Sequence, residues 1–194
     1  MKQKFLLAAT FAAALSMQAC QSDKKDSSSA DSLTTDTSVT TTTTDTTAMN
    51  PASTDANGFM EKAAVGGMME VEAGKIAQAK SSNAAVKAFA AMMVADHSKA
   101  NEELKGIAAK KSVTLPASLP EMEQGHLDAM SKMSGAEFDK HYVGMMVTDH
   151  AKTVDLFKAG SKNSDADVSG FANKTLPTIE AHYKKATEIQ SGLK

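Results

Sequence analysis

Apolar residues recur three and four positions apart along most of the chain from Phe59 onward, and this spacing constrains the fold more than any other feature. An α-helix has about 3.6 residues per turn, so the spacing gathers these side chains on one helical face. No segment alternates as a half-buried β-strand would. We therefore predict an all-α fold. Its expected helices cover 57–80, 83–110, a short 121–132, 134 to about 160, and 164 or 165 to the C-terminal end.

The connections between these helices favour one arrangement. The connection at 81–83 and the one after Gly160 are tight, whereas the middle one, which contains "LPASLP", is long. Proline cannot continue a helix, so this segment ends the second helix, and Pro177 should kink the last one. "SGAE" at 134–137 matches a capping box that would start the third long helix. One long crossover between the second and third long helices predicts a ferritin-like antiparallel four-helix bundle.

The first 56 residues differ in composition from the rest. An apolar run, "FLLAATFAAALSM", is typical of a signal peptide over 1–19 and is too short to span a bilayer. Cys20, the only cysteine, follows Ala19 as in a bacterial lipobox, which predicts cleavage before Cys20 and its lipidation. Ordinary secretion with a free cysteine is the alternative. The rest of 20–56 is rich in Ser, Thr and Asp and should be a disordered tether, which leaves 57–194 as the helical domain.

Composition excludes several classes of function. The net charge of −2 gives no basic surface for nucleic acid. The sequence contains no Arg, so a bidentate clamp for phosphate is lacking. Aromatic residues make up 5% of the chain and Trp is absent, which disfavours a stacking platform for carbohydrate. The predicted partner is a membrane, reached through the lipid anchor, and the sequence does not identify a protein partner.

One motif occurs twice, as "MMVADHSKA" from Met92 and "MMVTDHAKT" from Met145. It places His97 and His150 on helical faces where apolar core residues are expected, and His182 falls on such a face too. An unpaired buried imidazole nitrogen costs about 1–3 kcal/mol. All three histidines lie near the middle of their helices, so an antiparallel bundle would bring them into one layer. The sequence therefore predicts a polar cluster at mid-bundle.

Such a cluster could bind a metal. Glu70 and Glu72 lie at the same height on the first helix, and carboxylate and imidazole groups suit Zn, Fe or Mn. The candidate ligands are Glu70, Glu72, His97, His150 and His182. The candidates for a surrounding or structural network are Asp96, Asp149, Asp139 and Tyr142. A divalent metal is the cofactor that this set suggests.

Two alternatives stay open. Met93 and Met146 precede two of the histidines by one helical turn and could add soft ligands for copper. The interpretation favoured over both metal sites is that the polar residues pair with one another to fix the helix register and bind nothing. The di-iron signature Glu-x-x-His is missing, because apolar residues stand three before each histidine. No residue is assigned as catalytic.

Four segments resemble a bacterial family of unknown function whose members are predicted outer-membrane or exported proteins. They are "AAVGGMMEVEAGKIA", "VKAFAAMMVADHSKANEEL", "SGAEFDKHYVGMMVTDHAKTVDLF" and "LPTIEAHYKKA". The resemblance covers about 57–192 and implies a ferritin-like bundle and an envelope location. It marks as key positions Glu70, Asp96, His97, Asp139, Tyr142, Asp149, His150 and His182, and it implies no substrate.

Together these features predict an exported lipoprotein, held at the outer membrane, with one ferritin-like helical domain. A non-enzymatic binding or stress-related envelope role is favoured. The alternative is a metal-binding protein with a mid-bundle His/Glu site that could be redox-active.

Overall fold

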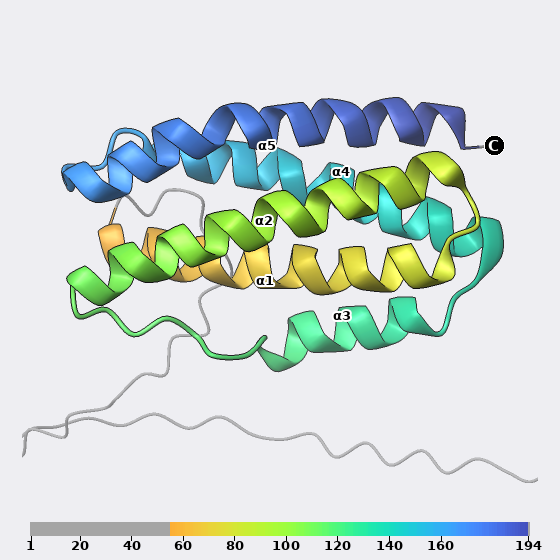
Figure 1. The fold of residues 1–194 in the computed structure, drawn as a ribbon, viewed down its shortest axis with the longest axis horizontal. Helices are drawn as coiled ribbons and strands as arrows, with labels where there is room; N and C mark the ends of the chain where they lie inside the picture. The colour runs from red at the N-terminus through yellow and green to blue at the C-terminus, as the bar shows by residue number, and fades with distance from the viewer. Residues whose placement is uncertain (1–54, 194) are drawn as a thin grey trace, which may run out of the picture. The chain divides into compact units, whose positions relative to one another are not determined.

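The computed structural model describes residues 55–193, and their regular structure is entirely helical (Figure 1). The helices are α1 (Ala56–Lys80), α2 (Ala84–Lys110), α3 (Glu121–Ser131), α4 (Gly135–Gly160) and α5 (Ala166–Gly192). No β-strand occurs within 55–193, so the predicted all-α fold is confirmed. The predicted signal peptide, Cys20 and nearly all of the tether lie outside the described residues. None of the described helices is long and apolar enough to cross a membrane.

Side-chain caps fix where three of the long helices begin. Asp55, Asn83 and Asp165 each accept hydrogen bonds from backbone amides of the first turn that follows. The predicted capping box at Ser134 is wrong, because its side chain makes no capping hydrogen bond. The chain instead enters α4 through Gly135, whose φ of +59° lies in the left-handed region that glycine adopts without steric cost.

The four long helices form the predicted bundle with its long crossover. α1 packs most extensively on α2, and α4 on α5, with smaller contacts between α1 and α4 and between α2 and α5. Each of these neighbouring pairs runs antiparallel (Figure 1). The crossover carries α3 back along the bundle, where α3 contacts α1 and α4. α2 and α4, which carry the repeated motif, therefore occupy diagonal corners. α5 runs unbroken through Pro177.

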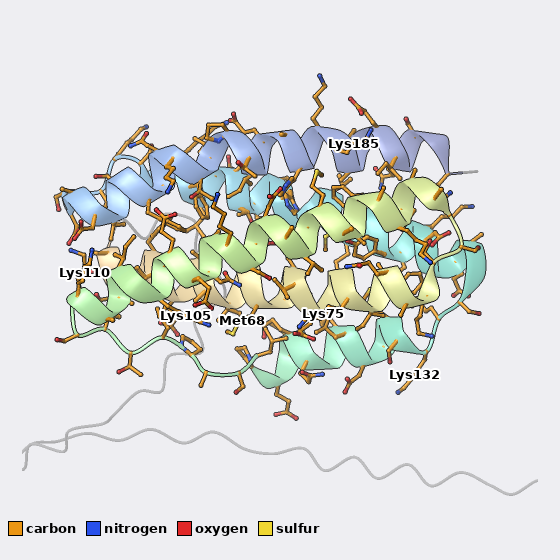
Figure 2. The ribbon with its side chains drawn as sticks, viewed as in Figure 1. Met68, Lys75, Lys105, Lys110, Lys132 and Lys185 are labelled. Atoms are coloured by element: carbon orange, nitrogen blue, oxygen red, sulfur yellow. The ribbon has the colours of Figure 1, made fainter. Side chains whose placement is uncertain are left out.

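The core consists of two apolar clusters, one at each end of the bundle. Phe59, Phe157 and Phe171 centre one cluster, with the Phe59 ring centroid 5.2 Å from that of Phe157. Phe89 and Tyr142 belong to the other. Lysines stand on the outer faces, and the labelled Lys185 and Lys132 lie on the outside of the bundle (Figure 2). The stretch of the bundle axis between the two clusters is polar.

Candidate functional site

A polar layer crosses the middle of the bundle, and each long helix contributes one residue to it. Glu70 comes from α1, His97 from α2, His150 from α4 and His182 from α5. Their exposed fractions are only 3%, 6%, 0% and 2%. His97 and His150, from the two copies of the motif, face each other across one diagonal of the bundle. Glu70 and His182 occupy the other diagonal.

The three imidazole rings lie against one another. The ring centroids of His97 and His182 are 5.3 Å apart, and each of these rings is 5.6 Å from that of His150. One nitrogen from each ring can be chosen so that all three lie within 4.8 Å of one another. Nitrogens bound to Zn²⁺ at about 2.0–2.1 Å lie roughly 3.4 Å apart in a tetrahedral site. Small ring movements would therefore gather them around one ion.

Each ring is held at one nitrogen by an oxygen that can only accept a hydrogen bond. His97 Nδ1 lies 3.0 Å from Glu70 Oε2, and His182 Nε2 lies 2.9 Å from Asp96 Oδ2. His150 Nδ1 lies 3.0 Å from the backbone oxygen of Met146 and 3.3 Å from Glu70 Oε1. Because a carbonyl or carboxylate oxygen accepts, the held nitrogen of each ring must carry the proton.

When the ring is neutral, its other nitrogen therefore carries no proton and presents a lone pair. These atoms are His97 Nε2, His150 Nε2 and His182 Nδ1, and each is buried without a hydrogen-bond partner among the described residues. An unsatisfied buried polar atom is rare in proteins and calls for an explanation. Three of them, from three rings in mutual contact, make up an arrangement of lone pairs suited to a cation.

Burial and neighbouring charges shift the pKa values of the four residues in this layer in different directions. Burial alone would raise the pKa of Glu70, but the charge on His97 and its hydrogen bond to the carboxylate lower that pKa to about 2. Burial lowers the pKa of His97, yet the Glu70 carboxylate outweighs burial and raises that pKa above its ordinary value. Burial also lowers the pKa values of His150 and His182, and for these two rings burial prevails. Without a bound cation, the layer thus favours one His97–Glu70 ion pair beside two neutral rings.

The two sides of the polar layer differ in how they are filled. One turn away on the Phe89 side, Met93 and Met146 are fully buried in the apolar cluster. One turn away on the Phe59 side stand Gly67, Ala100 and Thr153, which are small. A cavity of about 150 Å³ opens there. The two methionines of the repeated Met-x-x-x-His spacing therefore fill the bundle axis on one side of the histidines. On the other side the residues at the same distance are smaller.

Other predicted site residues lie apart from this layer. The sequence predicted Glu72 as a ligand in the polar layer, and the structure corrects this. The Glu72 side chain is 48% exposed and its Oε1 lies 2.7 Å from Lys75 Nζ. Two residues turn about 200° around a helix, so Glu72 points away when Glu70 points inward. Asp149 contacts Lys152 at 3.7 Å, whereas its counterpart Asp96 holds a histidine.

Asp139 and Tyr142 are buried on α4 but make few polar contacts. Asp139 Oδ1 and the Tyr142 hydroxyl have no hydrogen-bond partner within residues 55–193. Burial, with a contribution from the Glu70 charge, raises the pKa of Tyr142. Tyr142 thus lies within electrostatic reach of the layer without bonding to it. Met93 and Met146 pack in the core, and the soft-ligand role of their sulfur atoms stays a prediction.

Sequence reasoning missed two features of the site. The backbone oxygen of Met146 orients His150, and only the i–4 spacing within the helix could have signalled that contact. The small residues beside the layer were also missed as a group, since they come from three different helices. Gly67, Ala100 and Thr153 lie at one level because each is three residues along its own helix from the residue that this helix contributes to the polar layer.

Comparison with known proteins assigns the family. Residues 41–189 match the family described as domain of unknown function DUF4142. The chain belongs to DUF4142. A search of curated proteins found no match to this DUF4142 chain. Two solved structures share its fold, and both are DUF305 proteins.

The first is a DUF305 fragment from Deinococcus radiodurans, with a TM-score of 0.65 and 9% identity, covering 74% of the DUF4142 chain and 100% of its own. The second, from Streptomyces coelicolor, is described as a secreted DUF305 protein and has a TM-score of 0.61 and 13% identity. That match covers 73% of the DUF4142 chain and 94% of the Streptomyces chain. At these identities the likeness concerns the fold alone.

Proposed function

We propose that this DUF4142 domain binds one divalent transition-metal ion through His97, His150 and His182. The observation that carries the proposal is the set of three buried, unpartnered imidazole nitrogens within one layer. Imidazole suits Zn, Cu, Fe and Ni. Three protein nitrogens leave a further coordination position, as in zinc sites that bind water or a substrate.

The groups around the rings support the same proposal. Metal-bound histidines almost always donate their other N–H to a carboxylate or a backbone carbonyl, which fixes the tautomer and strengthens the ligand. Glu70, Asp96 and the Met146 carbonyl supply these acceptors here. The ionised Glu70 also balances one positive charge of the ion. A network that only fixed helix register would gain nothing from leaving three nitrogens unpaired.

Metal analysis tests the proposal. The protein is produced without an affinity tag, stripped with chelator, and incubated with Zn²⁺, Cu²⁺, Mn²⁺ or Fe²⁺ at neutral pH. We expect about one ion per chain with at least one metal, and a rise in Tm of several degrees, since a ligand at a hundredfold excess over Kd stabilises by about 2.7 kcal/mol. His150→Ala should abolish both effects.

The matched control is His141→Ala. His141 lies on the same helix but is exposed, so this variant should keep both the stoichiometry and the Tm rise. Absence of a Tm shift with every metal, together with strong destabilisation by His150→Ala, would instead assign the histidines to a structural network.

We further propose that the protein is exported and anchored to a membrane, most simply the outer membrane, through Cys20. The apolar run before Ala19 and Cys20 supports this proposal, as does the description of the Streptomyces relative as secreted. Acyl chains contribute about 0.8 kcal/mol per buried CH₂, so several chains would hold the protein firmly.

Cys20→Ser should move the protein from the membrane fraction to the soluble fraction, because it removes the only thiol. Ser22→Ala, which changes a neighbouring residue, should leave it in the membrane fraction. Cell fractionation with a carbonate wash measures the difference. Retention of Cys20→Ser in the washed membranes would contradict the anchor.

A further inference from the structure

The cavity beside the polar layer has a composition that points to its occupant. All four long helices line it, and Glu70 and His97 form its polar end. Its walls are mainly apolar and include Leu104, Phe171 and Ile179, all of which are buried. A cavity of this size, about 150 Å³, is comparable to an engineered apolar cavity that binds benzene.

The cavity follows the bundle axis directly away from the histidines. Each helix lines it with residues one and two turns from its own member of the layer: Gly67 and Ala63, Ala100 and Leu104, Thr153 and Phe157, Ile179 and Thr175. One helical turn rises about 5.4 Å, so the cavity begins at the polar layer, where Glu70 and the His97 ring line it. On the opposite side, Met93 and Met146 fill the axis. A ligand can therefore approach the cluster through the interior from one side.

A route from the surface also reaches this point. A larger groove of about 730 Å³ between α1, α3 and α4 shares Gly66, Glu70, Lys152 and Thr153 with the cavity. A Cβ atom added at Gly66 would meet nothing within 4 Å. Gly66 thus stands in open space where groove and cavity meet beside Glu70, and the missing side chain leaves the route clear.

We propose that this cavity is the binding site for a second ligand of the metal, a compact neutral molecule with an apolar body and one donor atom. This inference rests on the proposed metal site. Three imidazoles leave a coordination position, and the Met-filled side offers no space for an added ligand. Lys152 and Asp155 also line the cavity but are exposed. Its buried walls are apolar and disfavour a charged molecule, because a buried charge without a partner is costly. The volume limits the body to about the size of one six-membered ring.

Pyridine and benzene test the proposal as a matched pair, since they share size and shape but only pyridine has a donor nitrogen. The protein is loaded with Co²⁺, whose visible spectrum reports its coordination, and bound cobalt is measured after gel filtration. We expect pyridine to change the spectrum saturably. Benzene should raise Tm through cavity filling and leave the spectrum unchanged.

Gly66→Leu should weaken pyridine binding at least tenfold while retaining one Co²⁺ per chain, because the side chain extends into open space beside the cavity. The control is Gly170→Leu on α5, because an added Cβ there also meets nothing within 4 Å and Gly170 does not line this cavity. Failure of the chain to bind Co²⁺ would refute the metal site itself. A Co²⁺-loaded protein whose spectrum ignores pyridine, or a Gly66→Leu variant that binds pyridine as well as the parent, would overturn this inference alone.

Discussion

Glu70→Gln should destabilise the metal-free protein at pH 6 by about 3–5 kcal/mol, the usual cost of removing one partner from a buried ion pair. At this pH the Glu70 carboxylate keeps His97 protonated, so the substitution removes one partner of a buried ion pair and leaves His97 with burial, which lowers its pKa and disfavours its charge. At pH 8 the loss should be smaller, because His97 can release its proton. Urea denaturation in the presence of chelator measures both values.

Glu72→Gln provides the matched control, since it makes the same chemical change two residues along α1. Glu72 is half-exposed and forms a surface pair, so its loss should change stability by less than about 1 kcal/mol. Glu70→Gln should also weaken metal binding about 10–100-fold, the usual effect of altering a group that orients a ligand. Equal destabilisation by the two substitutions would show that Glu70 is not part of a buried pair.

The metal-free protein should be most stable near pH 6.5–7 and lose stability on both sides of that range. His150 and His182 have lowered pKa values in the folded state. The unfolded chain therefore binds protons more readily below about 6.5, their unperturbed value, and stability falls as the solution is acidified. Further loss follows below 4.5 as Glu70, whose folded pKa is about 2, becomes protonated in the unfolded chain first. That difference corresponds to roughly 3 kcal/mol.

The alkaline side has a different cause. The raised pKa of His97 stabilises the folded state fully below about 6.5, and this contribution is lost as pH rises through the folded value. On the acidic side, burial raises the pKa of Asp149. Protonation of Asp149 in the folded state therefore offsets part of the stability lost on acidification. Urea titrations from pH 4 to pH 9 measure the whole curve. The alkaline decline should vanish in Glu70→Gln, and equal stability at pH 5 and pH 7 would contradict neutral buried His150 and His182.

The repeated spacing of apolar residues was enough to predict the helices and their bundle. Periodicity near 3.6 determines which face of a helix is buried, and the long Pro-containing segment determines which connection crosses over. The same pattern placed His97, His150 and His182 on buried faces at mid-helix. Because height along a helix is additive in residue number, three residues near the centres of antiparallel helices share a layer in almost any such bundle.

Tertiary structure decided what depends on rotation about each helix axis and on neighbouring helices. It brought Glu70 inward and turned Glu72 to solvent, since 200° separates them. It placed Asp96 beside His182 on another helix, while Asp149 pairs with Lys152 on its own helix. It also combined small residues from separate helices into one cavity beside the histidines. Such a space depends on volumes summed across the bundle, which no single segment of the sequence contains.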